Sequence, residues 1–76
     1  MSGQVKFLII VEHDGHGFSA HCPDLPGCVA AADTLDETLR LMREAIPFHL
    51  EGLREDNLDI PEPTTEADYC YVEMTA

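Results

Sequence analysis

The fold of this chain is decided by the stretch Phe18-Ser-Ala-His-Cys-Pro-Asp-Leu-Pro-Gly-Cys-Val-Ala-Ala-Ala-Asp-Thr-Leu-Asp-Glu-Thr-Leu39. It predicts a strand, a tight turn, a second strand and the start of a helix. Pro23 and Pro26 end the first of these strands, Phe18–Cys22, because proline cannot donate a hydrogen bond to a sheet. The strand after the turn, Cys28–Ala32, carries small side chains that suit a position beneath a helix.

Both faces of the strand predicted before this stretch, Val5–Glu12, are largely apolar, although the second face also carries Lys6. One face carries Val5, Phe7, Ile9 and Val11, and the other carries Leu8 and Ile10. The solvent-facing side of a one-layer antiparallel sheet is normally polar. We therefore expect Leu8 and Ile10 to meet another subunit in a homo-oligomer, a dimer or a tetramer. Asp14-Gly15 predicts a hairpin turn that leads back into Phe18–Cys22.

A single long helix is predicted after the third strand. Thr34 and Glu37 have the spacing of a capping box, in which side chains satisfy the free backbone amides at a helix start. Apolar and weakly polar side chains then recur at spacings of four and three, which gives one core-facing stripe of Leu35, Leu39, Met42, Ile46, His49 and Leu53. Because the stripe continues past Pro47, we expect the helix to continue through it with a kink.

The rest of the chain predicts a connector and a last strand. Residues 55–63 are acidic and contain two prolines, which favour an extended path. In the last strand, Tyr69–Thr75, we expect Cys70, Val72 and Met74 to point inward. The predicted architecture is a single α+β domain over residues 1–76, in the order β-β-β-α-β, with one helix on one face of an antiparallel sheet.

The charge of the chain favours a basic partner and argues against nucleic acid. Its formal net charge is −11, from 15 acidic and 4 basic residues. Nucleic-acid binding depends on Lys and Arg neutralising phosphates, so direct binding to DNA or RNA is not expected. Acidity can simply keep a surface soluble, or it can complement a basic protein. The predicted partner contacts lie at the helix end and on the connector: Glu51, Glu55, Asp56, Asp59 and Glu62.

The cysteines and the hydropathy pattern predict a cytoplasmic protein. Three cysteines, without a signal sequence, indicate a reducing compartment rather than a disulfide framework. The most apolar run, Phe7 to Val11, is too short to cross a bilayer, so no membrane association is expected.

No catalytic or metal-binding constellation emerges from the residues. Cys22, Cys28, Cys70 and the histidines lack the close spacing of zinc ligands, and buried thiols acting as small hydrophobic groups account for the cysteines equally well. His49 falls on the apolar stripe, where a hydrogen-bonded core histidine is the more frequent occupant. The sequence therefore predicts no enzyme, no metal and no cofactor.

Several segments together resemble the HicB-like antitoxin family. Phe18-Ser-Ala-His-Cys-Pro-Asp-Leu-Pro-Gly-Cys is similar to the family's strand–turn segment, and Asp33-Thr-Leu-Asp-Glu-Thr-Leu to its helix start. Arg43-Glu-Ala-Ile-Pro-Phe-His-Leu-Glu-Gly-Leu resembles the rest of that helix, and Ile60-Pro-Glu-Pro the connector. The likeness runs from about Val5 to Pro63. Pro47 stands where such helices usually carry a helix-forming residue.

The resemblance implies a partial ribonuclease-H-like fold and inhibition by binding. Such domains cover the RNA-binding surface of a small basic toxin of the HicA type, which cleaves messenger RNA. Members that repress their own operon carry a C-terminal DNA-binding domain, whereas the likeness here is to the stand-alone N-terminal type. The sequence therefore does not predict autoregulation by this chain alone. The alternative is a homo-oligomeric scaffold or small-ligand-binding domain without a toxin.

Overall fold

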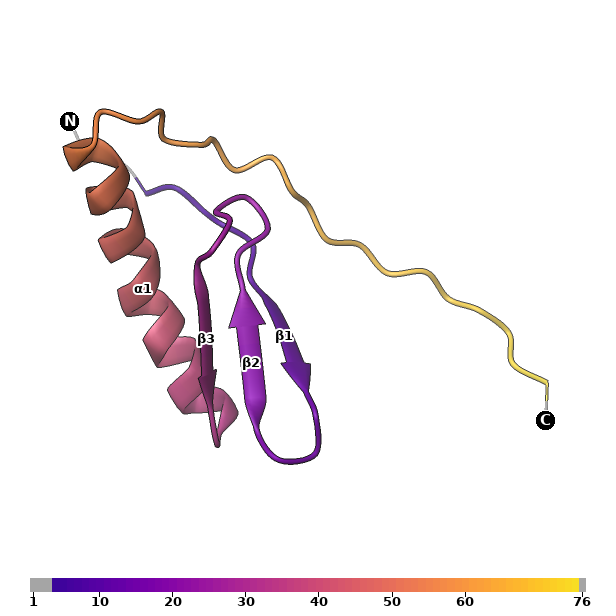
Figure 1. Ribbon diagram of the computed structural model, residues 1–76. Helices are drawn as coiled ribbons and strands as arrows, with labels where there is room; N and C mark the ends of the chain where they lie inside the picture. The colour runs from indigo at the N-terminus through magenta and orange to yellow at the C-terminus, as the bar shows by residue number, and fades with distance from the viewer. Residues whose placement is uncertain (1–3, 76) are drawn as a thin grey trace.

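The computed structural model describes residues 4–75 and contains one three-stranded sheet and one helix (Figure 1). The strands are β1 (Ile10–His13), β2 (Phe18–His21) and β3 (Val29–Ala32), and the helix is α1 (Leu35–Glu55). Both strand pairings are antiparallel, and the sheet order is β1-β2-β3. The predicted α+β class and the β-β-β-α part of the order are confirmed.

The first hairpin is closed by Asp14. Its carboxylate accepts hydrogen bonds from the amides of His16, at 2.9 Å, and Gly17, at 3.0 Å. These two bonds lower the pKa of the Asp14 carboxyl. β1 begins at Ile10, later than predicted, because Ile10 faces His21, the last residue of β2. Beyond that pair the chain turns away, so the residues before Ile10 have no strand to pair with.

The proline-bearing turn between β2 and β3 belongs to the core. Cys22 donates its amide to the carbonyl of Cys28 at 3.2 Å, and the amides of Leu25 and Cys28 bond the carbonyls of Cys22 and Leu25 at 3.0 and 3.1 Å. Gly27 has φ +87°, a conformation that side-chain-bearing residues rarely adopt. The Leu25 side chain is fully buried at 0% exposure. The turn therefore folds an apolar side chain inward and anchors it.

α1 begins and ends with well-formed caps. The Thr34 hydroxyl accepts the amide of Glu37 at 3.2 Å, which confirms the predicted cap. At the other end the amide of Leu58 bonds the carbonyl of Leu53 at 2.9 Å, and that of Asn57 bonds Arg54 at 3.1 Å. Asn57 has φ +56°. Together these features form a Schellman motif. The helix runs through Pro47 without interruption, as the apolar stripe predicts.

α1 covers one face of the sheet by packing on β2 and β3. Five buried apolar residues form the core: Ala20, Cys22, Leu25, Cys28 and Met42. Among the described residues one polar side chain, Thr38, is also fully buried. Its hydroxyl donates a hydrogen bond to the carbonyl of Thr34 at 2.8 Å. No element between residues 4 and 75 lies on the opposite face of the sheet (Figure 1).

The prediction of a fourth strand within this sheet is wrong. The Asp24 carboxylate holds the chain after α1 by accepting bonds from the amides and hydroxyls of Thr64 and Thr65, at 2.8–3.2 Å. Beyond this clamp the chain runs away from the domain (Figure 1). No hydrogen bond between backbone groups joins residues 69–75 to another described residue, and Cys70, expected to point inward, is exposed.

The prediction failed for a physical reason. Alternation with a period of two indicates that the two faces of a strand meet different environments, but it does not indicate which chain provides the neighbouring strand. The likeness to a partial ribonuclease-H fold depends on the fourth strand and stays a prediction.

Candidate functional site

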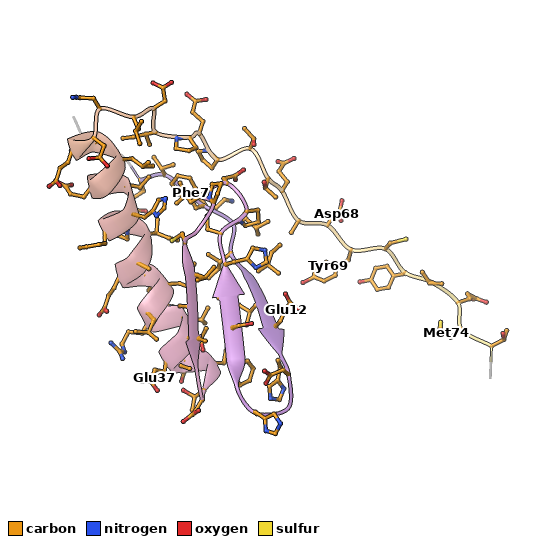
Figure 2. All side chains as sticks on the ribbon, viewed as in Figure 1. Phe7, Glu12, Glu37, Asp68, Tyr69 and Met74 are labelled. Atoms are coloured by element: carbon orange, nitrogen blue, oxygen red, sulfur yellow. The ribbon has the colours of Figure 1, made fainter. Side chains whose placement is uncertain are left out.

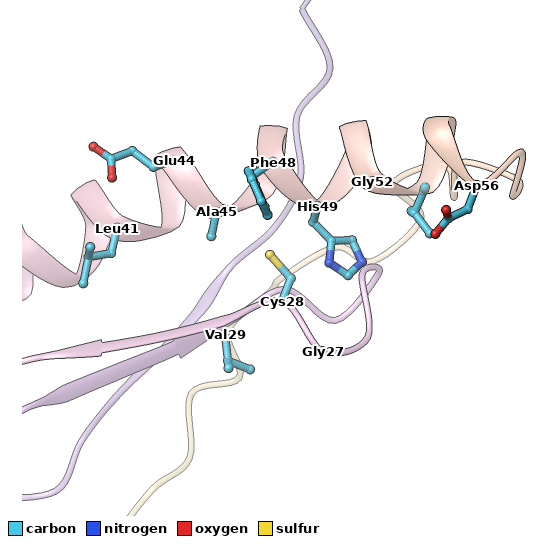
Figure 3. Close-up of a pocket in the computed structure, with 11 residues that line it drawn as sticks. Gly27, Cys28, Val29, Leu41, Glu44, Ala45, Phe48, His49, Gly52 and Asp56 are labelled. Atoms are coloured by element: carbon cyan, nitrogen blue, oxygen red, sulfur yellow. The ribbon is translucent and has the colours of Figure 1, made fainter.

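A groove of about 650 Å³ runs between α1 and the edge of the sheet at β3 (Figure 3). We call it the α1–β3 groove. Residues from the helix line one side, and residues at the start of β3 line the other. They are Gly27, Cys28, Val29, Leu41, Glu44, Ala45, Phe48, His49, Gly52, Leu53 and Asp56. The groove exists because α1 leans over β2 and β3 with small residues at the contact, which leaves the helix flank open.

Two exposed apolar side chains border the α1–β3 groove, Phe48 on the helix and Val29 at the sheet edge, where its side chain points to the face that α1 does not cover (Figure 3). Phe48 is 82% exposed and Val29 is 65% exposed. Apart from residues at the two ends of the described chain, these are the most exposed large apolar side chains of the fold. Scattered apolar residues are ordinary on a surface, but apolar residues gathered in a groove with a polar rim mark binding sites. This arrangement is therefore suited to receive a partner side chain.

Acidic residues form the rim of the groove. Glu44, Phe48, Glu51 and Glu55 follow one another at spacings of four, three and four residues, which places them on one face of α1. Asp56, the C-cap of the helix, also lines the groove. Carboxylates near a helix C-terminus meet the negative end of the helix dipole, and the last turn contains one basic residue, Arg54. Glu44 already pairs with Arg40 at 3.4 Å, so the carboxylates that would gain most from a positive group of a partner are those at the helix end, Glu51, Glu55 and Asp56.

The structure brings some of the predicted contact residues together and separates others. Asp56 is exposed and lines the groove, whereas Glu51 and Glu55 are exposed on the same face of α1 as Phe48 but do not line it. Asp59 and Glu62 are exposed on the connector beyond the helix and do not line it. Leu8 is half-buried just before β1, and Ile10 is 40% exposed on the sheet face opposite α1.

Sequence reasoning missed three residues of the site: Phe48, Glu44 and Val29. Phe48 had a signal, because its spacing places it off the core-facing stripe of the helix, where a large aromatic residue has no packing role. Val29 had none, because its exposure depends on which face of the sheet α1 covers, and that is a tertiary property.

The groove holds a thiol and an imidazole but no reactive pair. Cys28 and His49 lie on its facing sides (Figure 3). Burial raises the pKa of the Cys28 thiol, and the nearby Cys22 adds to this effect. The thiol is therefore a weak nucleophile at neutral pH. Among residues 4–75 no three His, Cys, Asp or Glu side chains are placed to hold a metal ion together.

Comparison with known proteins identifies the kind of domain that carries this groove. Residues 7–73 match the family described as HicB-like antitoxin of bacterial toxin-antitoxin system. The chain belongs to the HicB-like antitoxin family. The match includes the strand–turn segment, all of α1 and most of the extended C-terminal segment.

Relatives of this HicB-like domain occur in bacteria, an archaeon and a phage. A 14.9 kDa protein of Haemophilus phage HP1 is 39% identical over 63 residues, which are 83% of this chain and 47% of the relative. Antitoxin HicB 2 of Photorhabdus laumondii is 30% identical over 76 residues, 100% of this chain and 54% of the relative. A UPF0150 protein of Thermoplasma acidophilum is 33% identical over 63 residues, 82% of this chain and 91% of the relative.

The HicB-like chain thus spans about half the length of the first two curated relatives and nearly the whole of the third. In the part of the chain that the structure describes, α1 is not apolar enough to cross a membrane.

Proposed function

We propose that this domain neutralises a small basic toxin of the HicA type, which cleaves messenger RNA, by covering the toxin's RNA-binding surface. The observation that carries the proposal is the α1–β3 groove, with its exposed Phe48, its lining carboxylates Glu44 and Asp56, and Glu51 and Glu55 on the same face of α1 as Phe48. The domain acts by binding and has no catalytic step of its own.

Electrostatics support a basic partner at this site. A surface that binds RNA is rich in Lys and Arg because it neutralises phosphates. An acidic domain of net charge −11 attracts such a surface over a distance and speeds the encounter. The rim carboxylates then replace the phosphates as partners of the basic side chains. Asp59 and Glu62, farther along the connector, add to the attraction without entering the groove.

Phe48 supplies the affinity that charge alone does not. Binding energy concentrates in a few anchor residues, and aromatic side chains at the centre of an interface are frequent anchors. Phe48 is 82% exposed in the free domain, so nearly all of its surface can be buried by a partner. Helix geometry holds the ring between Glu44 and Glu51, and an Arg of the toxin can meet both the ring face and a carboxylate.

The test uses a purified small basic toxin of the HicA type, with binding measured by calorimetry and inhibition measured as protection of messenger RNA. We expect Phe48→Ala to weaken binding at least about tenfold, as for an interface anchor. The double variant Glu51→Lys, Glu55→Lys should weaken it by a similar factor. Helical circular dichroism should stay unchanged because these side chains are exposed.

The matched control is Asp33→Lys, Glu66→Lys, which changes the net charge by the same amount on exposed residues outside the groove. At physiological salt, charges farther apart than about 8 Å are largely screened, so this control should bind almost as the parent does. If both double variants lost the same affinity, the charge of the whole chain and not the groove would account for binding. A Phe48→Ala variant with parental affinity would remove the groove from the interface.

A further inference from the structure

The extended C-terminal segment carries the pattern of a strand but lies in water. Residues 69–75 alternate between two faces, one with Tyr69, Tyr71 and Glu73 and the other with Cys70, Val72 and Met74. Four of the large side chains are 70–96% exposed, namely Tyr69, Tyr71, Val72 and Met74. Figure 2 shows Tyr69 and Met74 on a stretch that has left the sheet. So much aromatic and apolar surface on one extended segment indicates a missing partner.

The same chain contains an unpaired sheet edge. β1 is bonded to β2 on one side only, and its outer edge receives no backbone hydrogen bond from any residue in the range 4–75. An edge strand with free amides and carbonyls is a template for another strand. Ile10 of β1 is 40% exposed and aligns with His21 and Val29 across the face that α1 does not cover. A strand added beside the outer edge of β1 would cover the exposed side of Ile10, the residue at that end of the row.

The chain does not fill this edge with its own segment. Thr65, Glu66 and Ala67 still line one cavity with residues 6–9, just before β1. After Asp68, whose carboxylate accepts the amide of Tyr69 at 2.7 Å, the segment departs. The Cα radius of gyration is therefore 15.2 Å, against about 11 Å for a compact domain of 76 residues.

We infer that residues 69–75 pair with the outer edge of β1 in a second copy of this chain, and that the second copy returns the same contact. This interface is independent of the toxin proposal, because it lies at β1 while the α1–β3 groove lies at the other edge of the sheet. A second copy is the fitting occupant since each chain offers both one free edge and one free strand. A two-fold axis satisfies both pairs and closes the assembly.

Because of the charge of the chain, the affinity of this dimer should respond to salt in the opposite way to the affinity of the toxin complex. Each copy carries a net charge of −11, and the segment after the clamp contains Glu66, Asp68 and Glu73 with no basic residue. The two copies repel each other, so added salt strengthens the dimer by screening. Attraction between an acidic domain and a basic toxin weakens with salt instead. The two interactions therefore respond to salt with opposite signs.

The test is the molar mass of the full chain by light scattering at about 100 µM, because association follows mass action. We expect twice the chain mass of 8.4 kDa. Val72→Pro removes a strand amide and should weaken dimerisation at least tenfold. Since Val72 is 70% exposed in the single chain, its helical circular dichroism should stay parental. The matched control, Ala67→Pro, lies before the segment at an amide without a hydrogen-bond partner among the described residues, and should remain dimeric.

Amide hydrogen exchange gives the second measurement. Residues 69–75 should be protected at high protein concentration and should lose protection on dilution. Protection that persists in a monomer would show that the segment closes on its own β1, and would overturn the inference. A monomer with unprotected amides would also overturn it, and so would a Val72→Pro variant that stays dimeric or a dimer that dissociates as salt is added.

Discussion

Leu25→Ala tests the finding that the proline-bearing turn is part of the core. Leu25 is fully buried, and its backbone amide and carbonyl both make turn hydrogen bonds that alanine keeps. The substitution therefore removes side-chain burial and leaves the turn bonded. Loss of three carbons at about 0.8 kcal/mol each gives roughly 2.4 kcal/mol, and the cavity left behind raises the cost to about 3 kcal/mol.

This loss is large for a domain of 76 residues, whose total stability is about 4–11 kcal/mol. Urea unfolding at fixed protein concentration, followed by helical circular dichroism, measures it. With a slope of about 1 kcal/mol per molar urea, the midpoint should fall by roughly 3 M. The matched control is Leu58→Ala, which removes the same atoms from a side chain that is 55% exposed, and it should cost about 0.5 kcal/mol or less. Equal midpoints for the two variants would refute a core role for Leu25.

Three further outcomes follow from local contacts. Gly17→Ala should destabilise the domain by about 1–3 kcal/mol in the same urea assay, because the new Cβ would lie 2.7 Å from the backbone carbonyl oxygen of Ala32. Thr34→Ala should cost about 1 kcal/mol, seen as a lower thermal midpoint, since it removes the acceptor for the Glu37 amide. The Asp24 carboxyl has a pKa below 3.8 because of hydrogen bonds from Thr65, first its hydroxyl and then its amide. The clamp on residues 64 and 65 is therefore complete above pH 3.8 and is lost as the pH falls through the lower folded value. The amide shift of Thr65 should report this transition, and Asp24→Asn should abolish it; a Thr65 shift that titrates unchanged in the variant would contradict the assignment.

The acidic character of the candidate site could be predicted from the sequence, but the position of the site in the fold could not. Glu51, Glu55 and Asp56 follow from acidic residues at a helix end, and of these Asp56 lines the groove while Glu51 and Glu55 lie on α1 outside its lining. Asp59 and Glu62 share their charge yet lie outside it, because the chain leaves the helix after the Schellman motif. Net charge is a property of composition, whereas a groove depends on which helix flank the sheet leaves open.

The sequence by itself determined the local structure of this protein. Thr34 with Glu37 starts the helix, the prolines and Gly27 end β2 and turn the chain, and the apolar stripe carries the helix through Pro47. Each of these depends on groups within a few residues of one another, so one sequence window contains both the cause and its effect.

Tertiary structure decided what becomes of Leu25, β1 and residues 69–75. Leu25 reads as a turn residue, and only the packing of α1 on β2 and β3 makes that turn an interior site. β1 shortens to Ile10–His13 because its partner strand ends. Residues 69–75 alternate like a strand, yet pairing needs a free edge at the right distance. Whether such an edge comes from the same chain or from another depends on long-range geometry, which local alternation does not encode.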